Sequence, residues 1–508
     1  MKVRRSAAIV AAACVLILGI PAAGGDTAED VFRNATLEAA WPLGETSSSE
    51  LAFWGERAYV ANGNGFRIFD IGGSSPRLLG AIRCMAPDGD VSVWDGDGDG
   101  VADLLIQSVD RPMQAAGCHH SPTAHDDPTG WEGLRVFAVE DPSNVELITT
   151  VYQDCGSHTN TVIPRPEEGR LLVLNSSFPL LPGPTCGPTR APAAGRDPLH
   201  GVVQVVEIPL ADPKQAREIA ELPVTYPGDV DNMYLPISEQ GLNGGTPGTT
   251  LIDGMRACFD VTVFIEAGVA AAGCGEQAQL WRLDAVTGLP DTAAPLWVYD
   301  HDHVDRWSRA TFSWDGRVVV FSDESHGGGC PATTVKRVRL GEPERQHPTG
   351  NTYFVDVATG ALHSEWRLPR TTQEAFVACS ASAGNVIPAR DRYLLAAAYG
   401  PAGTSLVDLT DPSEPTEVGY GDRSGAGTFV SYWYETHENH RRSSVTRLFS
   451  NDGSNNSPAV RNGLEQWAFT VGTFRREGMA RLNPQTQEDV LRTHVRVPRR
   501  EHPSLGGA

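Results

Sequence analysis

The chain has 508 residues, of which 41 are Lys or Arg and 63 are Asp or Glu, so its formal net charge is −22. A surface this acidic repels phosphate backbones, which excludes nucleic acid as an expected partner and favours divalent cations. Beyond the N-terminus no stretch approaches the length of a transmembrane helix, so we expect no integral membrane segment.

The N-terminal residues predict a cleaved secretory signal. Lys2, Arg4 and Arg5 provide a positive start, residues 7–20 are apolar, and small residues follow at positions 22–25. The apolar stretch is shorter than the roughly 20 residues that cross a bilayer. We therefore expect residues 1–25 to be a signal peptide and the protein to be secreted, with lipidation at Cys14 as the alternative.

From residue 49 onward one pattern recurs: an apolar strand, a turn of small residues, a second strand that ends in Asp, and a turn that contains Pro. Short β-branched and aromatic runs between Gly, Pro, Asp and Asn turns indicate an all-β chain. Repeated units that cannot bury both faces alone predict a β-propeller of about seven blades with loop insertions. Two β-sandwiches in tandem are the competing architecture. The clearest copies occupy residues 58–70, 133–151, 171–222, 269–299, 318–368, 393–419 and 445–470.

These copies also divide the chain. Residues 26–48 are expected to be an N-terminal linker, and residues 49–475 the propeller. Residues 476–508 lack the repeated unit and are expected to be a C-terminal tail, which adds a closing strand or lies over the propeller.

The strongest local motif is an alternation of carboxylates and glycines at residues 95–103, DGDGDGVAD. Calcium takes about six to eight hard oxygen ligands, and a tight acidic loop supplies them. The loop lacks the final Glu of an EF-hand and resembles the calcium loops of FG-GAP and thrombospondin-type repeats. The alternative is a solvated acidic turn. The expected ligands are the side chains of Asp95, Asp97, Asp99 and Asp103 and the carbonyl of Val101.

Several histidines could form a transition-metal site if their loops meet at one mouth of the propeller, since such a site needs about three or four N or S ligands. The alternative is that they are exposed loop residues. The pair in HENH is not the HExxH of a zinc protease. The histidines in question are His158, His301, His303, His326, His437 and His440.

Eight cysteines follow the signal, and an even number in an exported chain predicts disulfide bonds. None of their spacings fits a zinc cage. Many pairings are possible, and locality alone favours pairing of neighbours along the chain. That choice predicts the bonds Cys84–Cys118, Cys155–Cys186, Cys258–Cys274 and Cys330–Cys379.

Several phrases together resemble the LVIVD-repeat family of bacterial β-propellers. They include FRIFD, HTNTVIP, CFDVTVF, ATFSWDGRVVVFSDE, CSASAGNVIP, SLVDLTDPSEPTEVG, GLEQWAF and LNPQTQE, and they extend over roughly residues 50–490. The resemblance implies the propeller fold. It also implies a distant similarity to the selenium-binding-protein and methanethiol-oxidase propellers, whose histidines bind copper.

The chain departs from the family pattern at the histidines. It keeps His158, but Phe259, Ser308 and Ser382 stand at three positions where the family pattern has histidine. These three side chains cannot supply an imidazole. The resemblance therefore implies the fold without the family's metal centre.

The sequence contains no GxSxG elbow, phosphate loop or dinucleotide fingerprint. We therefore expect a secreted, non-catalytic, monomeric propeller that binds an unknown protein, peptide or small-molecule ligand and holds Ca²⁺ in its acidic loop. The alternative is a metal-dependent, copper-type oxidase that resembles the methanethiol oxidase propellers.

Overall fold

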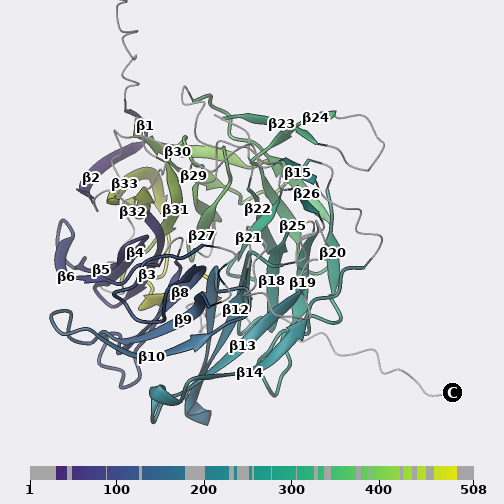
Figure 1. Ribbon diagram of the computed structural model, residues 1–508. Helices are drawn as coiled ribbons and strands as arrows, with labels where there is room; N and C mark the ends of the chain where they lie inside the picture. The colour runs from purple at the N-terminus through teal and green to yellow at the C-terminus, as the bar shows by residue number, and fades with distance from the viewer. Residues whose placement is uncertain are drawn as a thin grey trace, which may run out of the picture.

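The protein is described by a computed structural model, whose strands are arranged as a ring in Figure 1. In the described residues the secondary structure is β-strand apart from two single-turn 3-10 helices, η1 (Pro166–Glu168) and η3 (Pro213–Gln215). The structure describes residues 30–488 without 43–47, 87–88, 125–126, 128, 178–200, 228–233, 237–250, 254–256, 276, 302, 305, 325–329, 337–344, 373–378, 390, 424–426, 437–442 and 453–462.

The described strands form seven sets of four antiparallel strands, which we call blades one to seven. The nine-stranded sheet holds two of them, joined where the inner strands of blades six and seven pair in parallel. Blade one consists of β3 (Ser48–Trp54), β4 (Arg57–Asn62), β5 (Gly65–Asp70) and β6 (Arg77–Arg83), and blade two of β7 (Val91–Trp94), β8 (Leu104–Met113), β9 (Trp131–Ala138) and β10 (Glu146–Tyr152). Blade three consists of β11 (Thr159–Arg165), β12 (Arg170–Ser176), β13 (Val202–Pro209) and β14 (Arg217–Pro223), blade four of β17 (Asp260–Phe264), β18 (Val269–Cys274), β19 (Gln277–Arg282) and β20 (Trp297–Tyr299), and blade five of β21 (Trp307–Phe312), β22 (Val318–Asp323), β25 (Thr352–Asp356) and β26 (Leu362–Trp366). Blade six consists of β27 (Ala383–Val386), β28 (Leu394–Ala398), β29 (Thr404–Asp408) and β30 (Thr416–Asp422), and blade seven of β31 (Thr428–Trp433), β32 (Ser443–Asp452), β33 (Gly463–Phe474) and β2 (Ala35–Pro42). The two remaining hairpins are β15 (Tyr234–Pro236) with β16 (Leu251–Asp253), and β23 (Ala332–Lys336) with β24 (Arg345–Thr349).

The burial of each strand follows its place in the blade. Middle strands such as β12 and β18 are almost entirely buried because neighbouring blades cover both of their faces. Outermost strands such as β14 and β6 are mostly exposed or half-buried. The repeated sequence pattern therefore reports the packing of blades against one another, and it correctly predicts the propeller fold.

The Asp-Pro turns of the repeat end the third strand of a blade. Asp141 Oδ1 accepts a hydrogen bond from the backbone N of Ser143 at 2.9 Å, and Asp411 Oδ1 accepts one from Ser413 N at 3.0 Å. Each carboxylate thus closes a tight turn, while the proline that follows the Asp cannot continue the ladder.

The N-terminal residues close the ring. β2 forms the fourth strand of blade seven by pairing with β33, and β1 (Val31–Arg33) pairs with β30 of blade six. The segment expected to be a linker, residues 26–48, therefore contributes two strands instead. The physical reason is that the last repeat supplies only three strands and leaves an open sheet edge, which β2 covers.

The C-terminal residues lie across the inner strands. β34 (Arg481–Leu482) pairs with β3, and β35 (Thr486–Gln487) pairs in parallel with β17. Between them the side chain of Asn483 bonds both backbone groups of Val93 at 2.8 Å. Residues 481–487, within the segment 476–508 that was expected to be a tail, thus pair with inner strands; residues 489–508 fall outside the described part of the chain.

Three of the four predicted disulfide bonds are confirmed: Cys84–Cys118, Cys258–Cys274 and Cys330–Cys379. Cys155 is disulfide-bonded as well, and Cys186 lies outside the described residues. Among the residues that the structure describes, no helix is long and apolar enough to span a membrane.

Replacement of Asn483 by Ala should lower the free energy of unfolding by about 2–4 kcal/mol, because it leaves the buried N–H and C=O of Val93 without their partner. Urea unfolding measures the change. Asn144, exposed in a turn, is the matched control, and its replacement by Ala should cost less than about 0.5 kcal/mol. Equal effects of the two substitutions would show that the C-terminal segment does not brace the ring.

Candidate functional site

The inner strands place a ring of charged and polar side chains around the propeller axis. Glu50 lies on β3, Asp90 directly before β7, Asp260 on β17, Arg309 on β21 and Tyr432 on β31. Glu50, Asp90, Asp260 and Tyr432 are buried, and the side chain of Arg309 is 14% exposed. Five blades thus each contribute one polar residue to the axis.

The ring contains one guanidinium group, that of Arg309, and three carboxyl groups, those of Glu50, Asp90 and Asp260. Arg309 Nη1 donates to Glu50 Oε2 at 2.6 Å. The carboxylate of Asp90 instead accepts backbone N–H bonds, from Val91 at 2.8 Å and from Asn160 at 2.8 Å. When all three carboxylates are ionised, the ring therefore carries two more negative than positive charges.

Burial of this excess negative charge raises the pKa values of acidic groups in the ring. Burial raises the pKa of Asp260 to about 6, although the positive charge of Arg309 opposes the shift. Burial and the neighbouring charge of Glu50 raise the pKa of Asp90 well above its usual range. Burial also raises the pKa of the Tyr432 phenol, again with a contribution from Glu50.

The same carboxylates act on the guanidinium in the opposite sense. Burial alone would lower the pKa of Arg309, but the negative charge of Glu50 outweighs it, and the pKa is raised. Arg309 therefore stays protonated, and it is the fixed positive charge of the ring.

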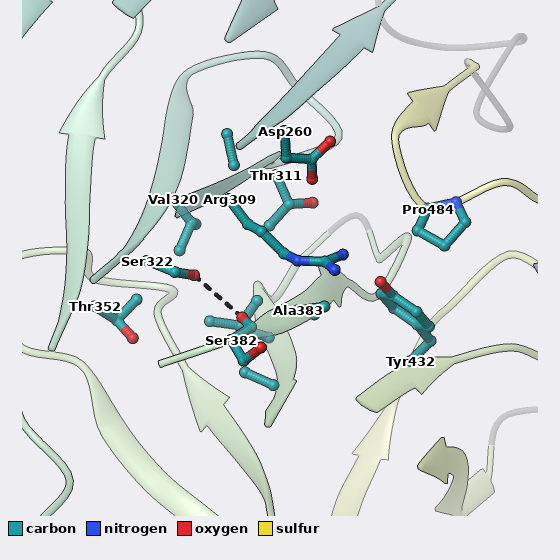
Figure 2. A pocket seen from close by; sticks show the side chains of 14 residues that line it. Asp260, Arg309, Thr311, Val320, Ser322, Thr352, Ser382, Ala383, Tyr432 and Pro484 are labelled. Atoms are coloured by element: carbon teal, nitrogen blue, oxygen red, sulfur yellow. Dashed lines mark hydrogen bonds between the residues drawn. The ribbon is translucent and has the colours of Figure 1, made fainter. Parts of the chain in front are cut away.

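A small cavity lies beside this ring (Figure 2). The enclosed part of the cavity measures about 20 Å³, which is room for about one or two water molecules, and the rest of the cavity opens to solvent. In Figure 2 the side chain of Arg309 extends into the space between Asp260, Tyr432 and Pro484. Hydroxyl groups line the opposite side, where Ser322 Oγ donates to the carbonyl of Ser382 at 3.1 Å.

The C-terminal segment forms part of the cavity wall through Pro484. Its neighbours hold it to the inner strands of blades three and five: Thr486 Oγ1 donates to Val162 O at 2.6 Å, and Gln487 Nε2 donates to Phe312 O at 3.3 Å. The segment and Tyr432 therefore face Arg309 from the same side of the cavity, as Figure 2 shows.

The positions that the sequence comparison with the LVIVD-repeat pattern singled out, at His158, Phe259, Ser308 and Ser382, lie near this site. The ring of His158 packs edge-on against Phe259 with 4.2 Å between centroids, and His158 Nδ1 lies 3.0 Å from Asp110 Oδ2. Ser308 Oγ donates to Ser322 O at 3.4 Å, and Ser382 lines the cavity. In the described residues, no group of three metal-capable side chains includes His158.

The remaining predicted histidines divide into two groups. His301 and His303 come together with Glu365, which the sequence did not suggest because it lies 62 residues from His303 on an outer strand. His326, His437 and His440 lie outside the described residues.

The predicted calcium loop joins β7 to β8. The carboxylates of Asp95, Asp97 and Asp99 lie within 4.8 Å of one another, and the loop is tied to blade one by a bond of 3.0 Å from Trp54 Nε1 to Asp95 Oδ2. Asp103 Oδ2 accepts a bond from Gly96 N at 2.6 Å. Val101 donates its N–H to Asp99 Oδ1 at 2.8 Å. Burial raises the pKa of Asp103, and the nearby charges of Asp97 and Asp95 add to the rise.

Sequence reasoning missed the charged ring at the axis. The available signal was a single ionisable residue inside each of several apolar inner strands, as in SELAFW, CFDVTVF and WSRATF. A charge in a buried strand is costly unless it is paired, so such positions indicate a site.

The fold and the axial ring define the class of the protein as a β-propeller with polar, charged side chains around its axis. No protein-family model matches the chain, and no curated protein matches it. A solved structure described as "Crystal Structure of Mitotic Checkpoint Complex" contains a similar chain, with 12% sequence identity and a TM-score of 0.44, over 86% of this chain and 95% of that one. The fold is established by the sheet topology, and these low values give the likeness no functional weight.

Replacement of Asp260 by Asn should stabilise the protein at about pH 7.5 by about 2–3 kcal/mol and have little effect at about pH 4. The folded-state pKa of about 6 lies above the ordinary value of 3.8, so the native state binds this proton more tightly. The stability from Asp260 is therefore present at low pH and is lost as the pH rises from about 4 to about 6, whereas Asn never ionises. Urea unfolding at the two pH values measures the difference.

The exposed Asp291 is the control for this comparison. Its replacement by Asn should change stability by less than about 0.5 kcal/mol at either pH. Destabilisation by Asp260→Asn at about pH 7.5 would contradict the assignment of a buried carboxylate in excess negative charge.

Proposed function

We propose that this protein is an exported, non-catalytic binding protein whose axial cavity takes the ammonium group of a small molecule, with the rest of that molecule in the part of the cavity that opens to solvent. The observation that carries the proposal is the carboxylate of Asp260, which lines the cavity and whose pKa is raised to about 6 by burial. At neutral pH this carboxylate is ionised at a cost, and an ammonium partner would remove much of that cost.

The charge of the whole ring supports a cationic ligand over an anionic one. Arg309 is committed to Glu50, so it does not neutralise Asp90 and Asp260 fully. An anion near Arg309 would meet the carboxylates of Glu50 and Asp260, whereas a cation beside Asp260 brings the ring closer to neutrality. The hydroxyl-bearing wall at Ser322 and Ser382 suits a ligand that also carries a hydroxyl group.

Export is supported by the signal-like N-terminus and by the disulfide bonds of the described residues. The oxidase alternative has weaker support. It requires imidazoles around His158, and that ring instead packs against Phe259, while Ser308 and Ser382 occupy two other family positions.

Ethanolamine is a probe of this proposal, and ethylene glycol is its matched control, since the two differ by an ammonium group in place of a hydroxyl. At about pH 7.5, a tenfold excess of ethanolamine over its Kd should raise the free energy of unfolding by about 1.4 kcal/mol and the Tm by about 2 °C. At about pH 5 the effect should shrink, because Asp260 is then mostly protonated.

Thermal unfolding of the wild type and of Asp260→Asn measures these effects. The proposal requires ethanolamine to stabilise the wild type more than ethylene glycol does, and the difference to vanish in Asp260→Asn. Equal stabilisation by the two compounds, or an ethanolamine effect that survives in Asp260→Asn, would overturn it.

We further propose that Ca²⁺ binds the loop at residues 95–103, with the side chains of Asp95, Asp97, Asp99 and Asp103 and the carbonyl of Val101 as its ligands. The close approach of the first three carboxylates supports it, since a divalent cation relieves their mutual repulsion. The loop contacts blade one through Trp54, so bound Ca²⁺ would stabilise the junction of blades one and two.

Addition of about 1 mM Ca²⁺ to chelator-treated protein should raise the Tm, and replacement of both Asp97 and Asp99 by Asn should abolish the rise. Calorimetric titration gives the stoichiometry. The matched control is Asp291→Asn, which should respond to Ca²⁺ as the wild type does. A response of the Asp97/Asp99 double variant equal to the wild type's would place the ion elsewhere.

A further inference from the structure

A second cluster of metal-capable side chains lies away from the predicted calcium loop, between blades four and five. His301 and His303 lie on the connection from β20 to β21, and Glu365 lies on β26, the outer strand of blade five. One possible ligand atom from each of the three residues lies within 4.8 Å of the other two. The fold thus brings two imidazoles and a carboxylate together from separate segments.

The closest pair already has the spacing of two ligands on one ion. His303 Nδ1 and Glu365 Oε2 are 3.1 Å apart. Zinc–nitrogen and zinc–oxygen bonds are about 2.0–2.1 Å long, so neighbouring ligand atoms of a tetrahedral zinc ion lie about 3.3 Å apart. A zinc ion could therefore replace the proton between these two atoms with little movement of either side chain.

The third imidazole is held beside this pair. The backbone N of His303 donates to His301 Nδ1 at 3.2 Å, and the two rings have centroids 4.9 Å apart. The ring of Tyr353 lies 5.2 Å from the ring of His301, and Tyr299 stacks against it at 6.0 Å. These contacts restrict His301 before any ion binds, which lowers the entropic cost of coordination.

The carboxylate is oriented by a second partner. Asn351 Nδ2 donates to Glu365 Oε1 at 2.9 Å, so the Oε2 atom faces His303. A hydrogen bond of this kind is typical of the residues that orient a metal-ligating carboxylate. The side chain of Glu365 is 17% exposed and that of His303 is 41% exposed, so solvent and ions can reach the cluster.

We propose that His301, His303 and Glu365 bind a zinc ion, with a water molecule in the fourth position. Two imidazoles and one carboxylate are a donor set that suits zinc, and calcium and magnesium disfavour it because they take oxygen ligands. The ion joins the loop between blades four and five to the outer strand of blade five. This site is independent of the ammonium site at the axis.

Zinc titration of the tag-free, chelator-treated full chain tests the proposal, with calorimetry as the readout. We expect one zinc ion with a Kd of about 1 µM or tighter. His303→Ala and Glu365→Gln should each weaken binding by at least 10–100-fold, roughly the loss seen when even an outer-shell partner is removed. Cobalt in place of zinc should give the intense visible absorption of a four-coordinate ion in the wild type only.

Two control variants keep the result interpretable. His363→Ala removes an exposed imidazole from the same strand as Glu365, and Asp97→Asn removes a carboxylate of the acidic loop. Both should retain the zinc affinity of the wild type, and the metal-free Tm of each variant reports whether it folds. Unchanged zinc binding in folded His303→Ala and Glu365→Gln, or no wild-type binding tighter than about 100 µM, would overturn the proposal.

Discussion

The structure depends on the way its two termini close the ring. The N-terminal strand β2 completes the sheet of blade seven, and the C-terminal residues 481–487 bond the inner strands of blades one to five. In the described residues no disulfide bond joins the first blade to the last, so these backbone and amide hydrogen bonds hold the ring closed. The segment around Asn483 contributes buried polar side chains whose partners are backbone groups, and such groups are costly to leave unpaired.

This closure also sets the chemistry of the axis. Pro484 of the C-terminal segment forms one wall of the cavity beside Asp260 and Arg309. Desolvation by burial raises the pKa of both Asp260 and Asp90. Excess negative charge in a buried ring lowers stability, and the cationic ligand proposed above would compensate it.

The sequence predicted the fold well because the repeat is local. Each copy carries its own strands and Asp-Pro turn, and the sequential cysteine pairs that the structure describes are likewise close along the chain. The closing elements were harder to assign. The N-terminal strand β2 has a half-exposed alternation, and the C-terminal NPQTQ is polar and resembles a loop, although its Gln485 and Gln487 are buried.

Among the candidate sites too, those whose residues are close along the chain could be predicted from the sequence, and those whose residues are far apart could not. The acidic loop is contiguous, so its members could be identified from the sequence, whereas Glu365 joins His301 and His303 only through the pairing of β25 with β26. The axial ring consists of single residues on or next to five inner strands, and no local spacing connects Glu50 with Arg309, which are 259 residues apart. Only the closure of the propeller brings these charges together.

The titration of Asp260 is the most direct test of the account. A carbon-13 NMR titration of the aspartate carboxyl groups, with Asp260 assigned by its absence in Asp260→Asn, should give a pKa of about 6 in the free protein. Saturation with ethanolamine should lower that pKa, because the ammonium group favours the ionised form. A value near the ordinary 3.8 in the free protein, or a raised value that ethanolamine leaves unchanged, would contradict a desolvated carboxylate that receives a cationic ligand.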